Sequence, residues 1–126
     1  MKLFQWITIK PVQTVAELPE FIRMADKLLS IVERQDLIRY LASHLRAGDP
    51  MEGTGGVRKL RWRRGDHGKS GGVRVIYYFH DEYMPLYLLT LFAKGDRANL
   101  SKGERNELAG LTRTLVGIWK AKGLKK

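Results

Sequence analysis

The chain has 126 residues, no cysteine and a formal charge of +10 at pH 7. This length suits one domain, so we expect residues 1–126 to form a single domain with a frayed basic tail at 120–126. The absence of cysteine excludes disulfides and thiolate zinc sites, and the three histidines are too far apart for a motif such as His-x-x-x-His. The sequence contains no membrane-length apolar run and no signal-peptide pattern, which predicts a cytoplasmic protein without metal or cofactor.

The excess of positive charge is concentrated in one segment, where Asp66 is the only acid. Its basic residues are Arg58, Lys59, Arg61, Arg63, Arg64, Lys69 and Arg74. Local charge of this kind predicts a polyanionic partner, because cations that neutralise phosphates release condensed counterions. A solvated basic surface is the alternative.

The first half of the chain predicts one strand and two helices. Residues 3–9, LFQWITI, alternate weakly and predict a strand. Two Ser/Thr-x-x-Glu capping boxes, TVAE from Thr14 and SIVE from Ser30, then predict helix starts. Apolar residues at helical spacing follow each box, and AGDP at 47–50 is expected to end the second helix.

The second half predicts three strands and a helix. The strands are 57–63, 73–79 and 85–93, which are rich in branched and aromatic residues. A third capping box, SKGE from Ser101, opens the last helix. The expected fold class is α+β, in the order β-α-α-β-β-β-α, with an antiparallel sheet packed by two N-terminal helices and a C-terminal helix.

The stretch GDHGKSGG, residues 65–72, contains a Gly-Lys-Ser triplet that is typical of phosphate-binding loops. Such loops have four residues between their first glycine and the triplet, and a helix follows them. Here only two residues separate Gly65 from Gly68, and a predicted strand follows. The stretch is therefore interpreted as a hairpin loop rather than a nucleotide cradle.

A symmetric hairpin places Arg61 opposite Arg74 and Lys59 opposite Ile76. Alternation then puts these three basic residues on one face of the sheet. The other face receives Leu60, Trp62, Val73, Val75, Tyr77 and Phe79. Like charges facing each other destabilise a sheet, so the pattern predicts an external anion such as RNA phosphate; arginines splayed into water are the alternative. Tyr78, on the basic face, is placed either to stack on a base or to pack against a helix.

These residues suit RNA cleavage, because RNA carries its own nucleophile, the 2′-OH. The protein has to hold the phosphate in line and stabilise its developing charge, for which arginine is well shaped. Positive neighbours favour the neutral amine of a lysine, which makes Lys59 a candidate proton acceptor. Lys94 is a candidate for contact with the leaving 5′-oxygen or the phosphate. The predicted catalytic set is Lys59, Arg61, Arg74 and Lys94; the predicted RNA-binding set is Arg58, Arg63, Arg64, Lys69 and Tyr78. No catalytic role is expected for His44, His67 or His80.

Three motifs occur in order: GTGGVRKLRW at 53–62, GGVRVIYYF at 71–79 after a Lys/Gly-rich loop, and LYLLTLFAKGDRANLS at 86–101. Each is weak alone, but the ordered combination resembles the HigB-type branch of the RelE/ParE toxin superfamily. The resemblance covers roughly residues 50–105 by motif and implies a RelE-like fold over the whole chain. It further implies a ribosome-dependent mRNA endonuclease, the toxin of a type II toxin–antitoxin pair, which cuts mRNA without metal.

The resemblance also implies partners and site residues. The partners are a HigA-type helix-turn-helix antitoxin, the 70S ribosome and mRNA, with operator DNA reached only through the antitoxin and no membrane. The basic catalytic positions of the family fall on Lys59, Arg61, Arg74 and Lys94. Some relatives carry Tyr or His just after the last strand, where this chain has Ser101, so the general base stays open. The alternatives are a non-catalytic basic RNA- or DNA-binding module and a membrane-surface protein.

Overall fold

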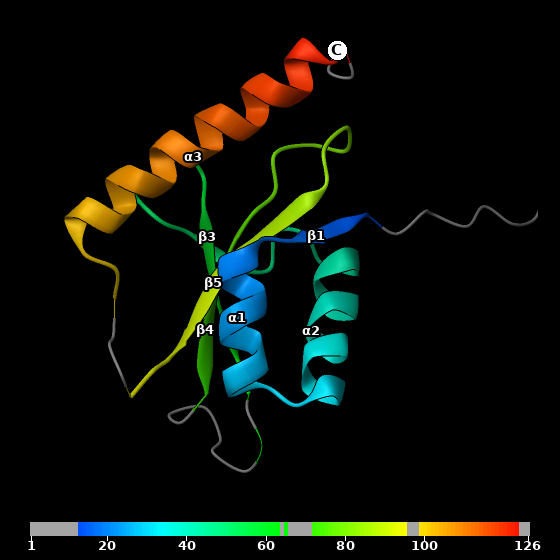
Figure 1. Cartoon of the computed structure of the whole chain (residues 1–126), viewed down its shortest axis with the longest axis vertical. Coiled ribbons are helices and arrows are strands. Elements are labelled where there is room, and N and C mark those ends of the chain that lie inside the picture. The colour runs from blue at the N-terminus through cyan, green and yellow to red at the C-terminus, as the bar shows by residue number, and fades with distance from the viewer. Residues whose placement is uncertain (1–12, 64, 66–71, 96–98, 124–126) are drawn as a thin grey trace, which may run out of the picture.

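The computed structural model describes residues 13–63, 65, 72–95 and 99–123 as an α+β fold (Figure 1). The elements in chain order are β1 (Val15–Glu17), α1 (Pro19–Leu28), α2 (Ile31–Ser43), β2 (Asp49–Pro50), β3 (Arg58–Trp62), β4 (Val73–Tyr78), β5 (Leu86–Ala93) and α3 (Lys102–Ala121). This confirms the predicted class, the three strands of the second half and the last helix. The predicted strand at 3–9 lies outside the described residues. Across the described part of the chain, no helix combines the length and apolar character needed to cross a bilayer.

The five strands form one sheet in the order β1-β5-β4-β3-β2. The β3–β4 hairpin pairs Arg61 with Arg74 and Lys59 with Ile76, which confirms the predicted register. The β4–β5 pairing is also antiparallel, whereas β1 runs parallel to β5. The sheet is therefore mixed rather than wholly antiparallel, because β1 joins the edge of the sheet beside β5 in the parallel direction.

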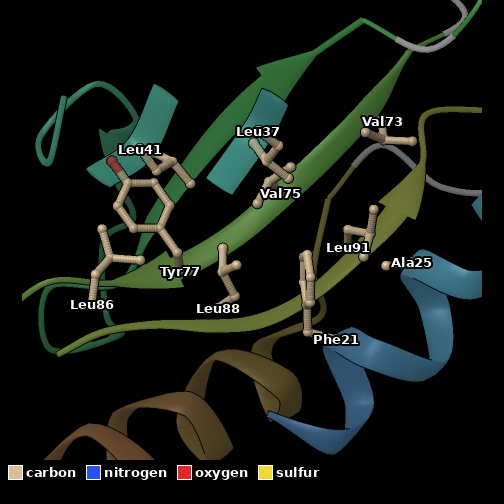
Figure 2. Packing of buried hydrophobic residues seen from close by; sticks show 10 residues of the cluster. All are labelled: Phe21, Ala25, Leu37, Leu41, Val73, Val75, Tyr77, Leu86, Leu88 and Leu91. Carbon is tan, nitrogen blue, oxygen red and sulfur yellow. The ribbon is translucent and has the colours of Figure 1, made fainter. Parts of the chain in front are cut away.

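Helices cover both faces of the sheet. On one face, α1 and α2 pack against β4 and β5; Figure 2 shows Leu37 beside Val75, and Phe21 beside the strand that carries Leu88 and Leu91. On the other face, Leu115 of α3 belongs to a second cluster that includes strand residues of β4 and β5. All six residues of β4 are buried. Any charged side chain on this central strand is therefore withdrawn from water.

The segment from Thr14 is a strand, and the predicted helix start there is wrong. The N–H of Leu86 donates to the carbonyl of Thr14 (2.9 Å), and the N–H of Leu18 donates to that of Leu88 (3.0 Å). These bonds to β5 satisfy backbone groups that a helix would otherwise use. The helix begins at Pro19, whose fixed φ and missing N–H suit a first helical position, and its N-cap makes no side-chain bond.

The other two capping boxes are confirmed. The Ser30 hydroxyl accepts from the N–H of Glu33 at 3.0 Å, and the Ser101 hydroxyl accepts from the N–H of Glu104 at 3.1 Å. In both boxes the glutamate returns a bond to the backbone of the capping serine. At the other end, α3 includes residues 120 and 121, so the helix extends into the segment predicted to fray. Residues 124–126 lie outside the described part.

The second helix ends at Ser43, earlier than the predicted stop at 47–50. The Tyr77 hydroxyl holds the following connection, because it donates to the carbonyl of Leu45 (3.0 Å) and accepts from the N–H of Gly48 (2.8 Å). Arg58 Nη1 donates to the Gly48 carbonyl at 2.7 Å. These bonds lead the chain into β2, which pairs with β3 and is too short to show in a sequence pattern.

Gly48→Ala tests this close packing. A Cβ at position 48 would lie 2.9 Å from both the carbonyl oxygen of Lys59 and the ring of Tyr77. Because one neighbour is backbone and the other a buried ring, we expect a loss of about 1–3 kcal/mol in the free energy of unfolding, measured by urea denaturation. Gly110→Ala on α3 is the control, since its Cβ would meet only the end of Arg113 at 3.8 Å. It should gain about 0.5–1 kcal/mol. Equal stability of the two variants would contradict the account.

Candidate functional site

Three of the four predicted catalytic residues come together on the face of the sheet that carries α3. Lys59 and Arg61 alternate along β3 with Leu60 and Trp62. These two apolar side chains point to the other face of the sheet, where they pack against the cluster under α1 and α2. Arg74 is paired with Arg61 on one side and with Phe92 of β5 on the other. The site is therefore built from adjacent strands of a rigid sheet, and its spacing is set by the hairpin register.

Arg74 is the unusual member of this group because its side chain is buried. The residue is 7% exposed, and its Nη1 donates to the carbonyl of the neighbouring Val73 at 3.4 Å. Among the described residues, no carboxylate forms an ion pair with it. Burial, and after it the charge of Arg61, lowers the pKa of Arg74 below its usual value. Burial without a counter-charge disfavours a cation.

Arg34 shows what a satisfied arginine looks like in the same chain. Its Nε donates to Glu17 at 2.8 Å and its Nη1 donates to Asp26 at 2.9 Å. The bond to Glu17 is the main cause that raises the pKa of Arg34. The fold thus pairs an arginine with two carboxylates where it links β1, α1 and α2. Arg74 has no such carboxylate partners in the described part of the chain, so its guanidinium can donate to an external anion.

Lys59 is positioned by a residue that was not predicted. Its Nζ donates to Oδ1 of Asn99 at 2.9 Å. Asn99 precedes Leu100, which is buried in the α3 cluster, and Ser101, which caps α3. The packed start of the helix therefore fixes the amide that holds the lysine. The motif RANLS contains this asparagine, but no sequence pattern connects it to a strand forty positions away.

Lys94 lies at the end of the site. It is exposed and immediately follows β5. Its backbone N–H donates to the carbonyl of Gly72 at 3.1 Å, which fixes it beside the start of β4. Arg63 is exposed just beyond β3, while Arg64 and Lys69 lie outside the described residues. The described cations at this end of the hairpin, Arg63 and Lys94, thus follow directly after β3 and β5.

Two predicted RNA-binding residues have structural contacts instead. Arg58 lies on the opposite face, level with Tyr77, and donates to the carbonyls of Gly48 and Arg46. Tyr78 is 5% exposed in the α3 cluster, and burial raises its pKa. Of the two interpretations of Tyr78, packing against a helix is the one seen, because α3 covers that end of the basic face.

The remaining polar candidates are also accounted for. The Ser101 hydroxyl accepts the Glu104 N–H in the α3 cap. His44 stacks on Tyr40 with ring centroids 4.2 Å apart, and His80 hydrogen-bonds the Tyr78 hydroxyl through Nδ1 at 3.2 Å. His67 lies outside the described residues. The described site therefore presents cations and the Asn99 amide.

Replacing Arg74 by methionine should stabilise the protein. Arg74→Met keeps an unbranched side chain of similar length and removes a buried, unpaired charge next to Arg61. We expect a gain of about 1–2 kcal/mol, or roughly 3–6 °C in Tm, measured by calorimetry. The control is Lys27→Gln, which removes an exposed charge on α1, away from Arg74, and should change stability by less than about 0.5 kcal/mol. A lower Tm for Arg74→Met would show that the charge is satisfied in the free protein.

A comparison with known protein families gives an independent result. Residues 19–125 match the family model described as the RelE toxin of the RelE/RelB toxin–antitoxin system. The match begins at the first residue of α1 and runs past the end of α3, so it includes every residue of the basic face. The strand β1 precedes it.

Proposed function

This chain belongs to the RelE toxin family and is the toxin of a toxin–antitoxin pair, and from that premise we propose that it is a ribosome-dependent mRNA endonuclease. The observation that carries the proposal is that Arg74, a residue only 7% exposed, has no carboxylate partner among the described residues and lies beside Arg61. A phosphodiester supplies the missing negative charge. The motifs at 53–62 and 86–101 support the HigB-type branch of the family.

In the proposed reaction, the 2′-OH of one nucleotide attacks the adjacent phosphorus and the bond to the 5′-oxygen breaks. The products are a 2′,3′-cyclic phosphate and a 5′-hydroxyl. Arg61 and Arg74 hold the non-bridging oxygens, where negative charge builds in the transition state. Their effect is larger for the buried Arg74, because a medium of low dielectric constant screens charge less than water does.

The two lysines take the proton-transfer roles in this proposal. The neutral amine of Lys59, held by Asn99, accepts the proton of the 2′-OH as the bond to phosphorus forms and becomes an ammonium group. Lys94 donates a proton to the leaving 5′-oxygen. Cleavage is metal-independent in this scheme, because side-chain cations supply the charge stabilisation.

The ribosome has a physical role in the proposal. The described site clamps a phosphate but offers few groups that would align a flexible RNA strand for in-line attack. An mRNA held in the ribosomal A site is already ordered, so the ribosome supplies the alignment. The net charge of +10 favours association with ribosomal RNA. The proposed antitoxin is a HigA-type helix-turn-helix protein, which would also connect the toxin to operator DNA.

One observation favours a second candidate, a basic module that binds RNA without cutting it. Some relatives carry a Tyr or His near the position of Ser101, and here the Ser101 hydroxyl is engaged in a helix cap. That position therefore contributes no acid or base. A binding module would occupy mRNA and leave it intact.

Induced expression separates these functions. The wild-type chain should arrest growth and cut mRNA within translated reading frames, as mapped by sequencing of RNA 5′ ends. Arg74→Met should relieve the arrest and accumulate as folded protein, because it removes the phosphate clamp. Lys27→Gln, an equal loss of charge on α1, should arrest growth like the wild type. Normal growth with abundant soluble wild-type protein would contradict the toxin activity, and arrest without mRNA cleavage would support the binding module.

Asn99→Ala tests the positioning of Lys59. Without the amide the Lys59 side chain loses its anchor, so we expect ribosome-dependent cleavage to slow by about tenfold. Asn106→Ala, at an exposed position of α3, is the control and should retain the wild-type rate. In the Lys59→Ala background, Asn99→Ala should have little further effect, because the two residues act as a unit. Independent, multiplying effects would contradict the positioning role.

A further inference from the structure

A hollow of about 360 Å³ lies between α3 and the glycine-rich turn at residues 53–56. Arg113, Gly117 and Lys120 line it on the helix side, and Gly55 and Tyr78 line it on the other. The lining contains two cations and no carboxylate. Both cations are exposed, and within the described residues neither forms an ion pair. The hollow therefore has the charge expected of an anion site.

The turn that forms one wall is fixed against the helix. The Thr54 hydroxyl donates to the carbonyl of Met51 at 2.6 Å and accepts from the N–H of Val57 at 3.1 Å. Gly55 has a φ of +78°, and a Cβ there would lie 2.7 Å from Oγ1 of Thr112. Only glycine allows this approach of the turn to α3. The GTGG motif thus shapes a preformed wall, independently of the catalytic residues.

We propose that this hollow binds a nucleotide of single-stranded RNA, with its phosphate between Arg113 and Lys120. These residues lie two helical turns apart on one face of α3, and their long side chains can converge on an anion between them. Gly117 and Gly55 carry no side chains, which leaves room for the sugar. The apolar lining from Ala109 and Val116 suits the uncharged part of a nucleotide.

The position of the hollow favours RNA over an acidic protein segment. Tyr78 is on the same face of β4 as Arg74 and four residues further along, a distance of about 13 Å. A few nucleotides bridge such a distance, so one RNA strand can contact both sites. The hollow then holds a nucleotide that flanks the cleaved bond. This inference rests on the proposed action of the protein on RNA.

The test measures binding rather than cleavage, in full-length protein that carries Arg74→Met. The probe is a short, fluorescent 2′-O-methylated RNA, which cannot be cleaved, and its Kd is measured by anisotropy at fixed salt. Arg113→Gln and Lys120→Gln should each weaken binding by about tenfold, because each removes a charged hydrogen bond to phosphate. Lys27→Gln on the opposite face is the charge-matched control and should weaken binding by less than about twofold.

Gly117→Leu distinguishes a pocket from a diffuse positive surface. Gly117 lines the hollow and a Cβ there meets nothing within 4 Å, so the position has space for a leucine, which takes up room in the hollow and leaves both cations in place. Leucine also favours the helix, so a folding defect is not expected. We expect about tenfold weaker RNA binding, whereas Gly117→Ala should bind nearly as the parent does.

The proposal is overturned if Gly117→Leu binds RNA like its parent, or if Lys27→Gln weakens binding as much as Arg113→Gln does. A polyglutamate peptide provides a second test. The proposal is also overturned if Gly117→Leu weakens the binding of this peptide but leaves the binding of RNA unchanged. That result would assign the hollow to an acidic protein partner. Cleavage on ribosomes is assayed separately with the wild-type chain. Failure there alone contradicts the endonuclease, and failure of the binding series alone contradicts the pocket.

Discussion

The placement of Arg74, a mostly buried residue with no carboxylate partner in the described part of the chain, is the constraint on which the site depends. Arg74 lies on β4, a strand whose six residues are all buried, and its Nη1 donates to the carbonyl of Val73 at 3.4 Å. The hairpin register places a second guanidinium, that of Arg61, alongside it. Both features are unfavourable for the free protein, and in our proposal a bound phosphate offsets both. The proposed anion site therefore forms at a cost in stability.

The two faces of the sheet have different roles. The face under α1 and α2 holds an apolar cluster together with Tyr77 and Arg58, whose polar atoms fix the connection from α2 to β2. The face under α3 is only partly apolar, and its basic residues lie on β3 and β4. Because β3 and β4 are paired neighbours in the sheet, the hairpin register sets the spacing of the proposed catalytic side chains. Asn99, which lies just before the start of α3, also contributes to this face, because its Oδ1 accepts a hydrogen bond from Lys59.

Sequence reasoning succeeded where local pattern decides the structure. The strands of the hairpin alternate clearly, and a symmetric loop leaves one sensible register, so the pairing of Arg61 with Arg74 could be predicted. It failed where long-range partners decide. Residues 14–17 carry the capping-box pattern TVAE, but residues 15–17 pair with β5 instead. Arg58 has the appearance of an RNA ligand but bonds to the backbone before β2, and the partner of Lys59 comes from a distant segment.

The central claim is that phosphate completes the environment of Arg74, and a thermal titration tests it directly. The Tm of the wild-type protein and of Arg74→Met is followed as inorganic phosphate is added, with Lys27→Gln as a third curve. General salt effects raise all three curves together, whereas binding at Arg74 stabilises only the proteins that retain it. The account predicts that the wild-type and Lys27→Gln curves rise more steeply than the Arg74→Met curve. Parallel curves for all three proteins would contradict it.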